Sequence, residues 1–315
     1  ILADLDWTGE LINSEYIGSY DLDMGDLTLD ISAGGQRTES RDHHITAHAE
    51  NLPPGDATVT GGASQQAREY RTKIINAGYF GQALIGFKDR YFLTLGMRID
   101  GFSAFGEEAG YQQLPKVSAS YIISDESFWP QTPVFGAMKL RVAWGKSGRA
   151  PGAFDAVRTW DPVGWGGAVA FFPENVGNSS LGPEITSEIE FGFDATFLND
   201  KVTMEFTSYD QTTTDALFSV TQTPSLGFLG SQLENVGELK NSGMEMAVQA
   251  DIVRTSSFGL SGGFTLATNN SEVLSLGGSP EFGVGGGGWI KEGGSVPGII
   301  GRKILNPNDL ADPDF

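Results

Sequence analysis

The chain has no cysteine among its 315 residues, which excludes a disulfide-stapled scaffold and any cysteine-based metal or redox site. Basic residues are scarce as well, because 20 Lys and Arg stand against 40 Asp and Glu, giving a formal net charge of −20. Nucleic-acid binding depends on a basic surface that contacts phosphates, so we expect no nucleic-acid partner. The sequence also lacks the runs of about 18 apolar residues that membrane-spanning helices require.

The sequence is rich in glycine and aromatic residues, and its apolar residues alternate with polar ones at a period of two. The clearest segment sets Tyr91, Leu93, Leu95, Met97 and Ile99 against Thr94, Gly96, Arg98 and Asp100. Residues with this period face opposite sides of a β-strand. The pattern predicts about ten strands of about ten residues each. They lie at 14–22, 27–38, 77–88, 91–99, 116–123, 138–146, 187–198, 202–209, 243–252 and 258–266.

The connections between these segments alternate between short and long. Tight turns are predicted at 24–25, 88–90, 199–200 and 255–257, and long loops at about 39–76, 103–114, 150–186, 212–236 and 273–315. This asymmetry is typical of a transmembrane antiparallel β-barrel, an up-and-down meander with short periplasmic turns and long extracellular loops. A soluble β-sandwich shows the same alternation, but strand length and unequal loops favour an all-β membrane barrel with its strands in 1–272.

In such a barrel one face of each strand contacts lipid and the other lines the lumen. The candidate lumen residues are polar side chains at mid-strand, namely Arg98, Asp100, Glu190, Asp194, Glu205, Glu245 and Gln249. The long loops add three aromatic candidates for ligand contact, Trp160, Trp165 and Phe228. Aromatic rings stack on sugars and peptides, but they also pack loops against one another, and both interpretations stay open.

All three histidines, His43, His44 and His48, lie within one predicted loop beside Asp42. Neutral imidazoles bind Zn, Cu or Ni, so this group is a weak candidate metal site. No helical pattern sets His44 and His48 on one face, and a solvated polar loop is the favoured interpretation. Calcium is a similarly weak expectation, because the acidic turn at 21–26 lacks the 12-residue ligand pattern of a calcium loop.

The sequence shows no recognisable catalytic arrangement. The glycine run at 283–288 is not followed by the Lys-Ser/Thr pair of a phosphate-binding loop, and no nucleophile elbow precedes a helix. A hydrolase on a soluble β-scaffold is a rival interpretation, but sequence proximity of carboxylates does not supply the spatial separation that glycosidases need. We therefore expect neither enzyme activity nor a resident cofactor.

Several motifs occur in a characteristic order. Lys88–Thr94 reads KDRYFLT and Arg98–Gly106 reads RIDGFSAFG. Further along, Leu140–Gly148 reads LRVAWGKSG and Asn235–Glu245 reads NVGELKNSGME. In order and spacing, these blocks resemble the signatures of SusC/RagA-type TonB-linked outer-membrane receptors.

The resemblance implies active import of an oligosaccharide or peptide across the outer membrane of a Gram-negative-type bacterium. It also implies a plugged barrel of about 22 strands, of which we expect this chain to supply about ten strands and no plug. The implied partners are outer-membrane lipid, a TonB-type energy-transducing complex acting through the plug, and a surface lipoprotein lid of the SusD type. A passive porin-like channel and a structural or adhesive surface barrel are the alternatives.

Overall fold

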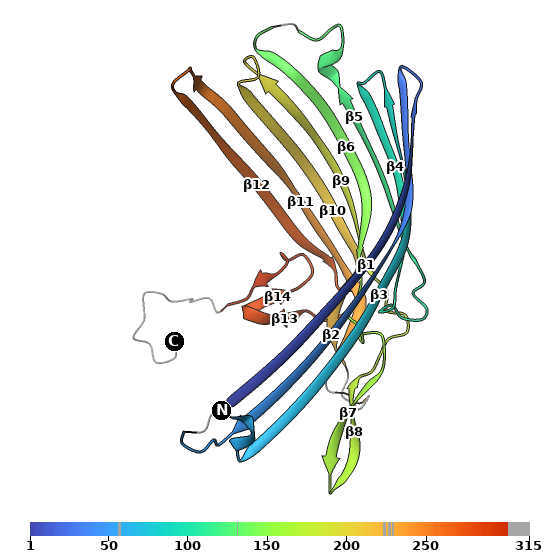
Figure 1. Ribbon diagram of the computed structural model, residues 1–315, viewed down its shortest axis with the longest axis vertical. Coiled ribbons are helices and arrows are strands. Elements are labelled where there is room, and N and C mark those ends of the chain that lie inside the picture. The colour runs from blue at the N-terminus through green and yellow to red at the C-terminus, as the bar shows by residue number, and fades with distance from the viewer. Residues whose placement is uncertain (56–57, 131, 223–224, 226–227, 229, 302–315) are drawn as a thin grey trace.

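The computed structural model describes residues 1–55, 58–130, 132–222, 225, 228 and 230–301. Within this part, ten strands form one antiparallel sheet in the order β1-β2-β3-β4-β5-β6-β9-β10-β11-β12 (Figure 1). These strands are β1 (Leu2–Asp23), β2 (Leu27–Glu50), β3 (Ser64–Phe87), β4 (Tyr91–Phe102), β5 (Gln112–Ile122), β6 (Phe135–Arg149), β9 (Glu184–Phe197), β10 (Val202–Thr221), β11 (Ser231–Arg254) and β12 (Gly259–Ser275). Each strand pairs with the next long strand along the chain, which confirms the predicted all-β meander.

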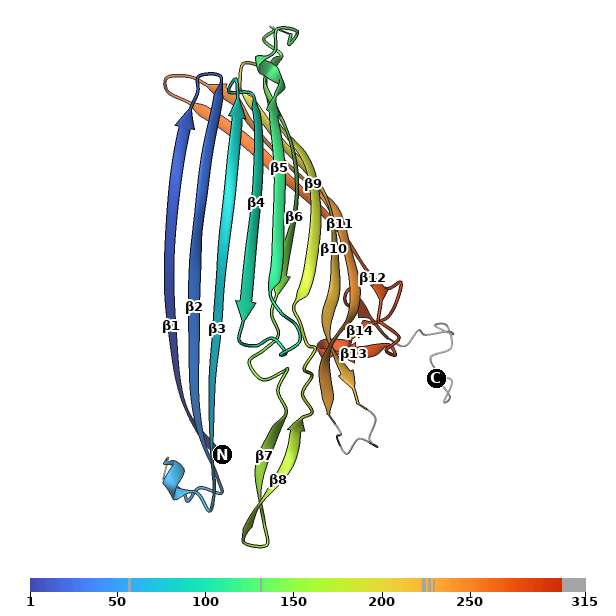
Figure 2. The same cartoon turned by 90° about the vertical axis from the view of Figure 1, so that its right-hand side faces the viewer.

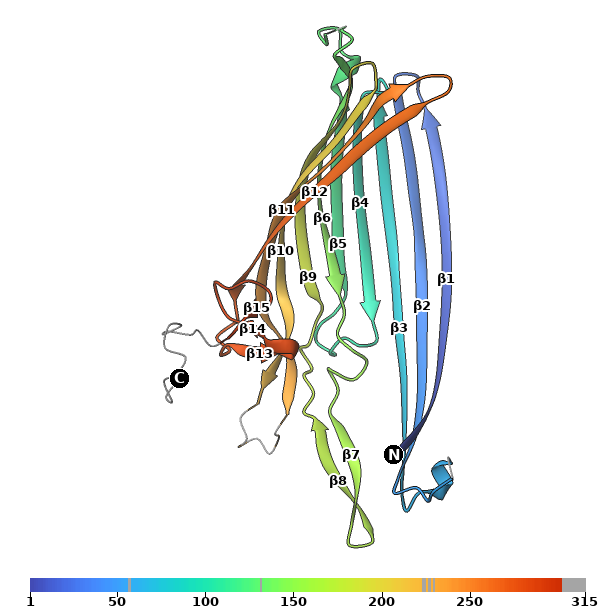
Figure 3. The same cartoon turned by 90° about the vertical axis from the view of Figure 1, so that its left-hand side faces the viewer.

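The sheet is a single curved layer that stays open between β1 and β12 (Figures 1, 2 and 3). At one end, here called the turn end, short connections such as 24–26 and 88–90 join the strands. Lys88 and Asp89 adopt positive φ angles of 54° and 53° there, which lets the chain reverse within three residues. The connection between β5 and β6, over 123–134, also lies at the turn end but is longer (Figure 1). The opposite, loop end carries the other long connections. It includes a hairpin of β7 (Thr159–Trp165) and β8 (Ala168–Asn175) that projects beyond the sheet (Figures 2 and 3).

The two faces of the sheet differ in both polarity and exposure. On β4, Leu95, Met97 and Ile99 are 45%, 43% and 41% exposed, whereas Asp100 on the opposite face is only 4% exposed. Side chains on the concave face of a curved sheet converge and cover one another, so the polar face is the concave one. A water-soluble protein would bury its apolar face instead. The convex apolar face, here called the outward face, is therefore suited to lipid.

The outward face is apolar over a limited height. On β2 the outward positions from the turn end are Leu27, Leu29, Ile31, Ala33 and Gly35, after which comes Arg37. At a rise of about 3.3 Å per residue and a tilt of about 40°, ten residues span about 25 Å, which matches the apolar band of a membrane barrel.

Aromatic side chains lie at both borders of this band. At the turn end Tyr91 stacks on Tyr121 with ring centroids 4.7 Å apart, and Phe135 lies edge-on to Phe197 at 6.3 Å. At the other border Tyr16 and Tyr79 lie in register on either side of Gly35. Such rings are typical of the two membrane–water interfaces.

The strands extend further at the loop end than the sequence predicts. The prediction of a loop over 39–76 is wrong, because β2 continues to Glu50 and β3 already begins at Ser64. Likewise β10 and β11 take up most of the loop expected over 212–236, β5 begins at Gln112 inside 103–114, and the β7–β8 hairpin occupies part of 150–186. Beyond the apolar band both faces meet water, so alternation disappears although the backbone pairing continues.

The segment expected as one loop over 273–315 also contains structure. β12 runs to Ser275, and a small sheet follows with strands β13 (Phe282–Val284), β14 (Gly288–Ile290) and β15 (Gly298–Ile299). Val273, Leu276 and Ile290 form a buried cluster that holds this sheet against the end of β12. Residues 302–315 lie outside the described part of the chain. Among the described residues, no helix has the length and apolar character needed to cross a membrane.

Adjacent residues on β4 test the assignment of the two faces. We expect Leu95→Arg to prevent much of the complete receptor from folding, because an arginine near the middle of a lipid-facing strand costs about 2–4 kcal/mol. Thr94→Arg is the matched control, since Thr94 lies on the polar face beside Ser118. The measurement is the folded fraction, seen as heat-modifiable migration in gels. Equal loss of folding in both variants would contradict the assignment.

Candidate functional site

The seven predicted lumen residues lie on one face of the sheet. Cross-strand register places side chains of paired residues on the same face, and Asp194 pairs with Glu205 while Glu245 pairs with Thr207. Following the same pairings along the sheet puts Arg98, Asp100, Glu190, Asp194, Glu205, Glu245 and Gln249 together on the concave face. The structure thus brings together residues from β4, β9, β10 and β11, and this polar concave face is the candidate functional site.

Arg98 and Asp100 form a buried charge pair near the loop end of β4. Arg98 Nε lies 2.7 and 2.9 Å from the two carboxylate oxygens of Asp100, whose side chain is 6% exposed. Arg98 Nη2 also donates to Gln36 Oε1 on β2 at 3.2 Å, passing over the Phe80 ring. A charge buried as deeply as Asp100 is tolerated when it is paired and hydrogen-bonded, so this network fixes the side chains at one end of the concave face.

A second network crosses three strands near the middle of the sheet. Arg141 on β6 donates from Nε to Asp194 Oδ1 at 3.2 Å and from Nη2 to Thr207 Oγ1 on β10 at 2.8 Å. The guanidinium passes over Gly192, where an added Cβ would lie 2.9 Å from Arg141 Cζ. Glycine on the intervening strand therefore gives this long side chain the room it needs.

Polar contacts continue toward β12. Gln211 donates to Glu188 Oε2 at 2.9 Å, and Tyr209 Oη donates to Asn269 Oδ1 at 3.1 Å. The Tyr209 side chain crosses Gly243, where an added Cβ would lie 2.7 Å from its hydroxyl. The concave face thus carries several separate hydrogen-bonded clusters of polar side chains, and carboxylates are prominent among them, so it is suited to polar solutes.

Sequence reasoning missed several members of this layer. Gln36, Arg141, Thr207, Tyr209 and Gln211 all bridge strands, yet none was among the candidates. The signal that could have found Thr207, Tyr209 and Gln211 is the alternation of β10, which places them on the same face as Glu205.

The histidines do not form the candidate metal site. They lie on β2 and not in a loop, and strand alternation turns His43 away from His44 and His48. His43 Nε2 lies 2.8 Å from Glu69, whereas His44 stacks on Trp7 at 5.6 Å between ring centroids. In the described residues no group of three or more His, Cys, Asp or Glu side chains is arranged to hold a metal.

The aromatic loop candidates have different surroundings. Trp160 and Trp165 lie on β7, in the projecting hairpin, and are 52% and 79% exposed. Phe228 is 5% exposed and packs against Gly230, so its ring offers no open face to a ligand. The exposed indoles of Trp160 and Trp165 remain candidates for ligand contact. Phe228 instead packs the loop end against itself, which is the other interpretation that the sequence left open.

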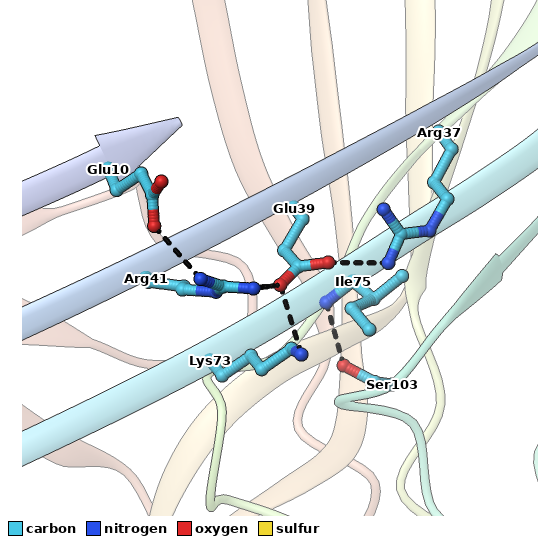
Figure 4. Close-up of polar contacts among 7 residues, drawn as sticks. All are labelled: Glu10, Arg37, Glu39, Arg41, Lys73, Ile75 and Ser103. Atoms are coloured by element: carbon cyan, nitrogen blue, oxygen red, sulfur yellow. Dashed lines mark hydrogen bonds and ion pairs between the residues drawn. The ribbon is translucent and has the colours of Figure 1, made fainter. Parts of the chain in front are cut away.

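An ion-pair cluster lies on the outward face just beyond the apolar band, outside the membrane-spanning part of β2 (Figure 4). Glu39, with a side chain 5% exposed, accepts from Lys73 at 2.9 Å and from Arg41 Nη2 at 2.6 Å, and it also pairs with Arg37. Arg41 Nη1 bridges to Glu10 on β1 at 3.0 Å. The hydrogen bond from Lys73, followed by those from Arg37 and Arg41, lowers the pKa of Glu39 to about 2.

Replacing a glycine beside Asp100 tests the buried charge pair. A Cβ at Gly78 would clash with Asp100 Oδ1, whereas a Cβ at Gly81 has no atom nearer than 4.0 Å. We expect Gly78→Ala to lower the free energy of unfolding by about 1–3 kcal/mol through overpacking, with Gly81→Ala as the matched control. Melting temperatures of the purified receptor variants report the effect. Equal melting temperatures for Gly78→Ala and Gly81→Ala would contradict the packing argument.

The lowered pKa of Glu39 predicts acid sensitivity. A carboxyl with a depressed folded-state pKa contributes stability above its unfolded value of 4.5 and loses it as pH falls toward about 2. We therefore expect Glu39→Gln to melt at a lower temperature than the unmodified receptor at pH 7, with the gap narrowing between pH 5 and pH 2. Glu107→Gln, on an exposed loop, is the control. A gap that stays constant over this pH range would contradict the role of the cluster.

Comparisons with known proteins agree with this geometry. The family model described as TonB dependent receptor-like, beta-barrel matches residues 3–299. TonB-dependent receptor P26 of Formosa agariphila is 33% identical over 243 residues, covering 73% of this chain and 24% of that protein. TonB-dependent receptor SusC of Bacteroides thetaiotaomicron is 26% identical over 298 residues, covering 87% of this chain and 29% of that protein.

A similar fold occurs in a solved structure described as the RagAB peptide transporter. The TM-score is 0.81 at 19% identity, and the match covers 93% of this chain and 34% of that one. The chain thus spans between about a quarter and a third of the length of the proteins it resembles. The matches to SusC and to RagAB confirm the resemblance drawn from the sequence motifs. The chain belongs to the TonB-dependent receptor-like β-barrel family.

Proposed function

We propose that this chain forms part of the barrel of an outer-membrane receptor that imports an oligosaccharide or peptide with energy supplied through TonB. The observation that carries the proposal is the pairing of a lipid-suited outward face with a hydrogen-bonding, carboxylate-rich concave face in a member of this family. The concave face would line the lumen, and Trp160 and Trp165 would meet ligand at the external mouth. Relatives named as receptors and a peptide transporter support a transport role over an enzymatic one.

The open sheet supports a larger barrel in the complete receptor. In the described chain β1 pairs with β2 alone and β12 with β11 alone, which leaves one edge of each strand unpaired. Unpaired backbone groups are costly in hydrocarbon, so further strands would have to close the barrel. An internal plug and a surface lipoprotein of the SusD type belong to the same proposal, and neither is supplied by the residues described.

Uptake dependent on energy coupling tests the proposal. Cells that express the complete receptor are given labelled oligosaccharides of several linkages and a labelled peptide digest, with and without TonB. We expect uptake of members of one panel to fall at least about tenfold without TonB, because passive diffusion through a plugged barrel is slow. Uptake that persists unchanged without TonB would show a passive channel, and no uptake of either panel would favour a structural or adhesive barrel.

Substitutions in the concave wall test the lumen assignment. Glu205→Gln combined with Glu245→Gln removes two carboxylates that face the lumen in this proposal, and we expect it to change the rate or selectivity of uptake. The control, Glu107→Gln combined with Glu108→Gln, removes the same charge from an exposed loop. Transport kinetics of charged and neutral panel members are compared at equal receptor abundance. Identical kinetics in the two double variants would remove Glu205 and Glu245 from the pathway.

A further inference from the structure

The small sheet of β13, β14 and β15 packs against the concave face of the ten-stranded sheet. Leu239 and Val273 pair across β11 and β12, and strand alternation puts both side chains on that face. Ile290 of β14 is buried in one cluster with Val273, and Leu239 packs against this cluster. Phe282 of β13 lies edge-on to Phe218 of β10, with ring centroids 5.4 Å apart. Three neighbouring long strands therefore contact the small sheet, which lies on the concave side and not beyond the edge of β12 (Figures 1 and 3).

Backbone hydrogen bonds also fix this segment to β12. The Val273 N–H donates to Gly294 O at 2.9 Å, and the Gly293 N–H donates to Val273 O at 2.8 Å. The Val296 N–H donates to Ser271 Oγ at 3.2 Å. The segment is thus attached to the edge of β12 that β11 leaves free, as well as to the concave face. Because the buried cluster and these bonds would have to break together before it could move, we expect it to be as rigid as the strand that carries it.

Strand alternation turns Trp289 away from the ten-stranded sheet. Ile290 and Phe282 pair with each other and face the buried cluster, so Trp289 points to the opposite side of the small sheet. Its partners on that side are Gly283 and Gly298. The indole is half-buried because it lies over Gly283, where an added Cβ would be 3.2 Å from the ring. On this side the three short strands therefore present one large side chain above glycines, directed into the hollow of the curved sheet.

We propose that the small sheet is a fixed shelf at the external mouth of the lumen, and that Trp289 limits the bulk of the ligand that can pass it. A layer packed on a sheet stands about 10 Å from it, so the shelf narrows the mouth by about that distance. Closely packed side chains resist compression, so an indole held over glycine excludes bulky groups. The inference rests on the proposed import function, which supplies the ligand that has to pass the shelf.

Uptake of ligands that differ in bulk tests the shelf. Cells that express the complete receptor are given the panel member with the fastest TonB-dependent uptake, either unmodified or carrying neutral appendages of increasing size. We expect Trp289→Ala to raise uptake of the bulkiest derivative, relative to the unmodified ligand, by at least about threefold, because the excluding side chain is gone. Tyr111→Ala is the matched control and should leave this ratio unchanged, since it removes a ring that is 79% exposed in the connection between β4 and β5.

The outcomes separate the shelf from the import function. An unchanged ratio in Trp289→Ala would overturn the shelf while TonB-dependent uptake leaves the import proposal standing. An equal loss of uptake for all derivatives would also overturn it, because Trp289 would then be a ligand contact and not a limit on size. Absence of TonB-dependent uptake in the unmodified receptor would overturn both proposals.

Hydrogen exchange tests whether the shelf is fixed. In the complete receptor we expect amides 271–276 to exchange slowly, and equally slowly when the imported ligand is present at saturation, because the bonds to the small sheet protect them. Ile290→Ser should speed this exchange and raise the uptake ratio as Trp289→Ala does, since it removes an apolar side chain from the buried cluster. Leu274→Ser, at a residue 40% exposed, is the matched control. Protection that is lost when ligand binds would show a moving lid and overturn the proposal, as would an unchanged uptake ratio in folded Ile290→Ser.

Discussion

The structure depends on one constraint, namely that a strand crossing hydrocarbon must hydrogen-bond its backbone to neighbouring strands while its two faces meet different media. Within a single-layer sheet the inner strands satisfy this, because each pairs its backbone with a neighbour on both sides and alternation assigns each side chain to the outward or the concave face. This explains why the molecule has so little conventional core. Its buried apolar cluster around Val273 lies at the end of β12, outside the apolar band, and serves only to attach a small sheet.

The same constraint explains what the sequence could and could not predict of the fold. On β4 one face is apolar and the other is polar, so the period of two in the sequence is clear. Strands with this contrast can be predicted from the sequence, together with the residue at which each one ends in a tight turn. Beyond the band both faces are polar, so residues 39–50 carry no such contrast and are predicted as a loop although they continue β2. The prediction that His43, His44 and His48 lie in a loop failed for the same reason. On a strand, neighbouring side chains point to opposite faces, whereas in a loop they could converge on a metal.

The candidate site was predictable in its orientation but not in its contacts. Placement of Glu190, Glu205 and Gln249 on one face needs only the alternation within each strand. The reach of Arg141 to Thr207 also needs the strand order and a glycine at position 192, and the cluster around Glu39 needs three strands in register. Register is a property of the folded sheet, and no single segment of sequence specifies it.

Lipid on one face and water on the other is the central claim, and spin labelling measures it most directly. The chain has no native cysteine within these residues, so single cysteines at 93–98 of β4 in the complete receptor can each carry one label in a bilayer. Collision with oxygen should peak at 93, 95 and 97, and collision with a water-soluble nickel reagent at 94, 96 and 98. Accessibility without this period of two, or with the opposite phase, would contradict the account.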